Sequence, residues 1–297
     1  MNQNGEAELG LGEIARDAGV TAWIHATRLT GPAESIGLGA TVSVSIASLY
    51  KLPLALVWAD LVEQGELQAS STVRLRAKER ISGPTGTAML LDDVSLSQRD
   101  LVRFMLALSD NAAGDAILAL IGRDRVHAHL KALGLSATLI RQGSAEATRA
   151  LIRDTGAPSR TAAEGVLADP DRVSYTSQYD SALASAGSAE ELTAVLRILW
   201  SRAGESYEMV RDAMAHQAWR HRIGSGFPHD DVTVWGKTGS LGRLRHEVAV
   251  VQYPLEHPVA VAVLTRAARP ERHLPRVDTA IGELAREAAA PLRLPVS

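Results

Sequence analysis

The sequence predicts an α/β (α+β) protein in which both chain ends supply one sheet and the middle is helical. Near the start, residues 20–29 and 35–45 have the alternating pattern of half-buried strands. Near the end, residues 232–239, 247–254 and 258–267 have the same strand character. Apolar residues between them recur at helical spacing. The simplest packing joins the strands of both ends into one sheet and sets the helical middle beside it.

The helices are expected in order along the chain. A long one runs from about Ser48 to Gln64, and Gly65 ends it. Others are predicted over residues 7–18, 97–108, 112–121, 124–133, 189–201, 205–218 and 275–288. Segment 141–188 is rich in Ala, Ser, Gly and Asp and is predicted to be largely irregular, with one short helix. We expect an α/β subdomain, residues 1–47 and 206–297, and a mainly helical subdomain, residues 48–205.

Composition narrows the class of protein. The 297 residues are 46% hydrophobic, with a net charge of −3 and no cysteine. The near-neutral charge gives no reason to expect nucleic acid or a membrane as partner. The absence of cysteine excludes disulfides and thiolate chemistry. The first residues lack the basic and apolar regions of a secretory signal. As written, the chain is expected to be cytoplasmic, or secreted or periplasmic if a leader has been removed.

Three short motifs raise a chemical question. Ser48-Leu-Tyr-Lys51 places a lysine at the start of an apolar helix, where a buried charge is costly unless it is used. Ser109-Asp110-Asn111 lies in a break between helices, and Lys237-Thr238-Gly239 ends a strand. Each motif alone is weak. In this order, and on these elements, they are the S-x-x-K, S-D-N and K-T-G signature of penicillin-recognising enzymes.

The chain therefore resembles the class A β-lactamase-like serine hydrolases. The surrounding text, such as "LYKLPLALVWADLVEQGEL" and "LALSDNAAGDAIL", is similar to that family. The resemblance spans about residues 7–290, except segment 141–188. It implies a β-lactamase/transpeptidase-like fold, with an antiparallel sheet flanked by helices and an all-helical subdomain. The sequence has no nucleotide-binding motif and no histidine spacing typical of a metal site, so we expect no cofactor and no metal.

Four residues are expected to carry the catalysis: Ser48, Lys51, Ser109 and Lys237. A serine hydroxyl is a weak nucleophile until a neighbour accepts its proton. Lys51, three residues after Ser48, shares its helical face, and burial beside a second cation, Lys237, would make the Lys51 amine neutral. The resemblance implies that Ser48 forms the acyl-enzyme and that Ser109 relays a proton to the leaving nitrogen.

The resemblance also implies the substrate-binding residues: Asn111, Thr238, Gly239, Ser240 and Arg245. The N–H groups of Ser48 and Ser240 would form an oxyanion hole. Asn111 would bind an amide side chain of the substrate. Thr238 and a downstream arginine would hold a substrate carboxylate. Both Arg243 and Arg245 lie near the expected position, and we favour Arg245.

One family feature is incomplete. Class A β-lactamases carry an E-x-x-L-N motif whose glutamate positions the deacylating water. The nearest match here is Glu164-Gly-Val-Leu167-Ala168, in which alanine replaces the asparagine. We therefore expect a serine hydrolase that cleaves a β-lactam or another amide or ester bearing a carboxylate, with slow deacylation. The alternatives are a D,D-peptidase-like or biosynthetic amidase, esterase or acyl-transfer enzyme, and a non-catalytic penicillin-binding sensor.

Overall fold

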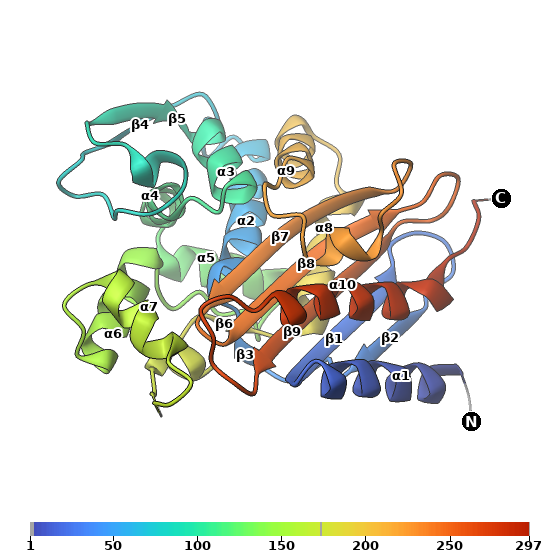
Figure 1. Ribbon diagram of the computed structural model, residues 1–297. Coiled ribbons are helices and arrows are strands. Elements are labelled where there is room, and N and C mark those ends of the chain that lie inside the picture. The colour runs from blue at the N-terminus through green and yellow to red at the C-terminus, as the bar shows by residue number, and fades with distance from the viewer. Residues whose placement is uncertain (1–2, 173, 297) are drawn as a thin grey trace.

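A five-stranded antiparallel sheet forms the centre of the computed structural model, which describes residues 3–172 and 174–296 (Figure 1). The strand order is β2-β1-β9-β8-β7. Their bounds are Ser35–Leu38, Val20–Arg28, Val259–Ala267, Leu244–Gln252 and Thr233–Leu241. The prediction of one sheet built from both chain ends is confirmed, and so is the mixed α/β class.

Each face of the sheet has its own core. On β8 and β9, alternate residues such as Val251 and Val261 pack under α1 (Gln3–Asp17) and α10 (Pro275–Ala289). Figure 1 shows these two helices side by side over one face. The intervening residues, such as Val250, belong to the larger core shared with the helices of the middle of the chain. This period of two is what a sheet buried on both faces requires.

The helical part surrounds α2 (Lys51–Glu63), whose residues from Lys51 to Leu61 are all buried. A 3₁₀ turn, η1 (Ala47–Tyr50), precedes α2, so the predicted helix start at Ser48 is a tighter turn. The helices around α2 are α3 (Gln98–Ala107), α4 (Asn111–Ile121), α5 (Arg123–Ala132), α8 (Ala189–Ser201) and α9 (Glu205–Ala215). Helix α8 also packs on β1 and β9, although residues 189–201 were assigned to the helical part.

Short elements complete the chain. Two small sheets pair β3 (Val44–Ser45) with β6 (Ala186–Gly187) and β4 (Thr72–Leu75) with β5 (Val94–Ser97). The strand predicted over 35–45 is thus two strands, because Gly39 turns the chain with a φ of 56°. The remaining 3₁₀ turns are η2 (Gly86–Met89), η3 (Ser177–Tyr179), η4 (Ile223–Gly226) and η5 (Ala290–Leu292). No helix among the described residues is long and apolar enough to cross a membrane.

Segment 141–188 is more ordered than predicted. It contains two helices, α6 (Ser144–Thr155) and α7 (Arg160–Ala168), so the prediction of a largely irregular segment with one short helix was wrong. Asp115 of α4 holds the start of α6, because its carboxylate accepts hydrogen bonds from the N–H groups of Ser144 and Ala145. Leu151 and Leu167 then close a small core between the two helices.

Candidate active site

Ser48 lies in η1, where a backbone constraint fixes the turn. Ala47, the residue before it, has a φ of 46°, which is rare for a residue with a Cβ. The N–H of Ile46 donates to Ser185 O, and the N–H of Leu49 donates to Ile46 O. These bonds anchor both sides of the turn, so Ser48 is presented at a fixed position at the mouth of α2.

Lys51 is fully buried at the first turn of α2. Its Nζ donates to Ser109 O at 2.6 Å and to Asn111 Oδ1 at 2.8 Å, and it lies 3.4 Å from Ser109 Oγ. Burial is the main reason why the pKa of Lys51 falls to about 7. A neutral amine has two hydrogens, and the two short bonds use both. Its lone pair is then available to accept a proton.

Ser109 is held between the helices in an uncommon backbone conformation, with a φ of 55°. The neighbouring Asp110 stabilises this break, since its Oδ1 accepts from the N–H groups of Ala112 and Ala113 and caps α4. Its other oxygen accepts from the N–H and the hydroxyl of Thr87, each at 2.6 Å. Asp110 thus fixes Ser109 through the backbone.

Lys237 reaches Ser109 from a different element, the edge strand β7. Its Nζ donates to Ser109 Oγ at 2.9 Å and to Thr238 O at 2.7 Å. Burial, followed by the nearby charge of Lys51, lowers the pKa of Lys237 well below its usual range. The two lysines predicted from the motifs therefore meet at one hydroxyl, in surroundings that oppose their carrying two full charges.

Gly239 lies directly against η1. A Cβ at this position would lie 2.8 Å from Ile46 O and 3.0 Å from Leu49 Cγ, so a side chain cannot fit without a shift. Only a glycine lets β7 come this close to the turn. Ser48 and Ser240 consequently line the same two cavities, and their backbones are the candidates for an oxyanion hole.

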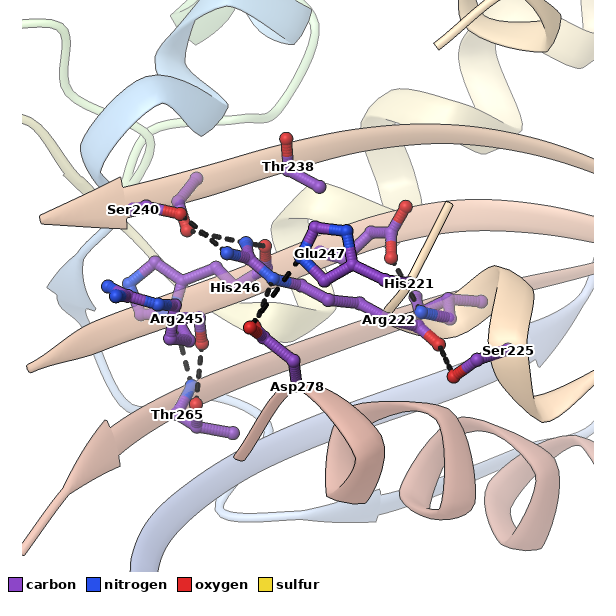
Figure 2. Close-up of polar contacts among 12 residues, drawn as sticks. His221, Arg222, Ser225, Thr238, Ser240, Arg245, His246, Glu247, Thr265 and Asp278 are labelled. Atoms are coloured by element: carbon purple, nitrogen blue, oxygen red, sulfur yellow. Dashed lines mark hydrogen bonds and ion pairs between the residues drawn. The ribbon is translucent and has the colours of Figure 1, made fainter. Parts of the chain in front are cut away.

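Arg222, which the sequence analysis did not select, contributes a guanidinium to the site. It comes from the segment before η4 and lines the same cavity as Ser48 and Ser240. Figure 2 shows its Nε donating to Asp278 of α10 at 2.6 Å and its Nη2 donating to Ser240 Oγ at 2.7 Å. Its Nη1 donates to Gly239 O at 3.1 Å. The ion pair with Asp278 thus fixes Arg222 against the K-T-G strand.

Arg245, the predicted carboxylate-binding arginine, is placed differently. Its Nη1 donates to the carbonyl oxygens of Gly242 and Leu244, so the guanidinium turns back on the β7–β8 hairpin. It does not line either cavity beside Ser48. Arg243 Nε donates to Ala267 O, and Arg243 likewise lines neither cavity. The arginines that line these cavities, Arg160 and Arg222, therefore come from segments upstream of K-T-G.

Glu247 and Gln217 form a buried network behind β7. Gln217 Nε2 donates to Glu247 Oε1 at 2.7 Å, and Gln217 Oε1 accepts from the N–H of Thr238 at 2.7 Å. The other Glu247 oxygen accepts from the N–H of Ile223. Burial raises the pKa of Glu247 to about 7. The side-chain amide of Gln217 thus supplies a hydrogen-bond acceptor for the backbone N–H of Thr238 on the open edge of the sheet.

Two cavities adjoin Ser48. The larger, about 270 Å³, is lined by Ser109, Asn111, Arg222, Thr238 and Ser240 among others. The smaller, about 70 Å³, lies between η1 and α6 and has polar walls that include Tyr50, Gln142, Ser144 and Gln178. Within the part of the chain that the structure describes, no Asp or Glu lines either cavity. Glu164 instead pairs with Arg160 at 2.7 Å, with 46% of its side chain exposed.

Comparisons with known proteins place this geometry in a family. The model of the β-lactamase enzyme family matches residues 10–291. The β-lactamase regulatory protein BlaB of Streptomyces cacaoi is 28% identical over 284 residues, which cover 88% of this chain and 89% of that protein.

Solved structures have the same fold at low identity. A β-lactamase from Sphaerobacter thermophilus superposes with a TM-score of 0.75 at 21% identity, over 96% of this chain and 97% of that one. An acyl-enzyme complex of a PBP-A mutant with penicillin G gives 0.75 at 17%, over 97% and 96%. A variant of an ancestral class A β-lactamase of Gram-negative bacteria gives 0.78 at 20%, over 97% and 98%. This chain belongs to the β-lactamase enzyme family.

Proposed function

We propose that the protein is a penicillin-recognising serine enzyme that forms a long-lived acyl-enzyme at Ser48. The substrate is a β-lactam, or another acyl amide or ester, that carries a carboxylate. The convergence of Lys51 and Lys237 on Ser109 Oγ, beside Ser48, is the observation that carries this proposal. Burying a lysine ammonium costs several kcal/mol unless it is paired or neutralised, and groups buried in this way gather at functional sites.

Acylation follows from these contacts. Neutral Lys51 accepts the hydroxyl proton of Ser48, and Ser48 Oγ attacks the carbonyl carbon of the substrate. As the carbonyl oxygen gains charge, the N–H groups of Ser48 and Ser240 donate to it. The carbon–nitrogen bond then breaks, Ser109 gives its proton to the leaving nitrogen, and a lysine ammonium restores that proton. The result is an ester on Ser48 and a released or ring-opened amine.

Substrate positioning uses both sides of the larger cavity. Asn111 is proposed to bind the amide of the acyl side chain. Its Oδ1 accepts from Lys51, so its Nδ2 is the group that would donate to the carbonyl oxygen of that amide. Thr238 and Ser240 are proposed to hold the substrate carboxylate together with Arg222, which takes the role that the sequence analysis gave to Arg245. Three of the four N–H groups on the terminal nitrogens of Arg222 already donate within the protein, so the fourth, on Nη2, is left for a charge-assisted hydrogen bond to the carboxylate.

Deacylation is proposed to be slow. Hydrolysis of the ester needs a base that activates a water molecule next to the acyl carbon. The lining of both cavities offers hydroxyls, amides and guanidinium groups there, and no carboxylate from any described residue. The imidazole of His221, which also lines the larger cavity, has its Nε2 3.5 Å from Asp278 Oδ2, in the carboxylate that holds Arg222. Glu164 lies outside both linings. An acyl group on Ser48 should therefore persist.

A sensor that binds penicillins without turnover is the second candidate. The regulatory protein BlaB, at 28% identity, favours it, and a persistent acyl group is a suitable signal. The two candidates share the acylation step and differ in whether the adduct is eventually released.

The test is intact mass followed over time after mixing with benzylpenicillin, beside the Ser48→Ala variant. We expect an adduct of the whole penicillin on the wild type only, decaying over hours. An adduct that never decays favours the sensor. Rapid release of product would contradict slow deacylation. The absence of any adduct would overturn the assignment of β-lactams as substrates.

A further inference from the structure

Arg160 gives the site a second guanidinium. It begins α7 and lines both cavities beside Ser48, whereas Arg222 lines only the larger one. Arg160 Nε donates to Glu164 Oε1 at 2.7 Å. Among the described residues, its two terminal nitrogens have no hydrogen-bond acceptor, and about a third of the side chain (33%) is exposed. Two guanidinium nitrogens, with four N–H groups, therefore remain available at the junction of the cavities.

The two arginines have a similar arrangement. In each, a carboxylate holds Nε and so fixes the plane of the guanidinium: Asp278 for Arg222 and Glu164 for Arg160. They reach the site from unrelated elements, Arg222 beside β7 and Arg160 from α7. The lining between them contains no acidic side chain. A ligand with one carboxylate, placed at Arg222 and Ser240, would leave the terminal nitrogens of Arg160 unused, because Glu164 engages only its Nε.

We propose that the cleft is built for acyl compounds with two acidic groups, and that Arg160 binds the second one. This inference rests on the proposed function, because it names the substrate class of the same site. One carboxylate lies at Arg222, and the other lies on the acyl side chain, near Asn111 and Arg160. Arginine suits this role because its planar fork matches a carboxylate.

The test compares two penicillins that differ by one carboxylate: benzylpenicillin and its α-carboxy analogue, carbenicillin. Dissociation constants are measured by calorimetry on Ser48→Ala protein, so that the result does not depend on acylation. We expect Ser48→Ala protein to bind carbenicillin more tightly than benzylpenicillin. Adding Arg160→Gln should weaken carbenicillin binding about tenfold, the usual effect of one charge-assisted hydrogen-bonded pair. Benzylpenicillin binding should change little.

Arg153→Gln is the matched control, since it removes the same charge from an exposed position on α6 that lines neither cavity. It should leave both dissociation constants unchanged. The proposal is overturned if carbenicillin has no advantage, if the advantage survives Arg160→Gln, or if neither penicillin binds. Failure of the proposed function appears separately, as the absence of an adduct on wild-type Ser48 with either penicillin.

Discussion

Gly239 is the position at which a single methyl group should disable the site. In Gly239→Ala the new Cβ would lie 2.8 Å from Ile46 O, whereas ordinary contact begins at 3.4 Å. Backbone surrounds it on this side, because Leu49 N lies 3.2 Å away. Strand β7 must therefore move away from η1 by about 0.6 Å, the difference between the two distances. That shift separates Ser240 from Ser48.

The Gly239→Ala substitution should lower the acylation rate more than the stability of the fold. Loss of one oxyanion donor typically reduces the rate by about 10²–10³-fold, or roughly 3–4 kcal/mol in the transition state. We expect the second-order rate of acylation by a fluorescent penicillin to fall by about 10²-fold in Gly239→Ala. Overpacking of this size typically lowers the free energy of unfolding by about 1–3 kcal/mol, so the fold should survive.

Gly12→Ala is the control, since Gly12 lies in α1 and a Cβ there meets no atom within 4 Å. It should leave acylation unchanged and stabilise the protein slightly, because alanine favours a helix over glycine by about 1 kcal/mol. Acylation of Gly239→Ala at the wild-type rate, with its thermal unfolding also unchanged, would refute the reasoning that η1 and β7 must be in contact.

Three further predictions concern buried charges. The acylation rate should rise with pH through about 7, because burial lowers the pKa of Lys51 to about 7 and only its neutral form accepts a proton; a flat rate profile would argue against Lys51 as the base. Asp110→Ala should lower the free energy of unfolding in urea by about 3 kcal/mol, since it removes the cap of α4 and the partner of Thr87; a loss below about 1 kcal/mol would contradict this. Burial raises the pKa of Glu247 from 4.5 to about 7, so the folded protein binds this proton more tightly than the unfolded chain does. As the pH rises from 4.5 to 7, the free energy of unfolding of the wild type should therefore fall by at most about 3 kcal/mol relative to that of Glu247→Gln. Parallel stability curves for the two proteins would exclude that linkage.

The residues around the lysines were the most predictable part of the site. Ser48 and Lys51 are three apart, a spacing that puts both on one face of a helix. Ser109 and Lys237 were placed by motif order, and in the structure Lys51 and Lys237 both donate to Ser109 Oγ. The long strands β1, β7, β8 and β9 were equally predictable, because a period of two survives even where both faces are buried. The short strands β4 and β5 were not predicted.

The misplaced features depend on contacts between distant segments. Helix α6 has a weakly apolar sequence, and the carboxylate that caps it, Asp115, lies 29 positions before Ser144. A local search for capping residues cannot find such a partner. Arg222 was missed for a similar reason, since its orientation depends on Asp278, which is 56 positions away. Spacing downstream of K-T-G therefore favoured Arg245, whose side chain bonds within its own hairpin.

The pairing of β1 with β9 determines when the site can form during folding. Val20 lies opposite Ala267, so a strand near the start of the chain finds its partner only after most of the chain has been made. Contacts at such separation form slowly, while the helices around α2 depend on nearer ones. Strand β7, which carries Lys237, joins the sheet only through β8 and β9. A nascent chain that stops before β9 would contain all four residues expected to carry the catalysis, Lys237 included, but β7 would have no completed sheet to hold it, so the chain would not react. Labelling of Ser48 would therefore report that the sheet had closed.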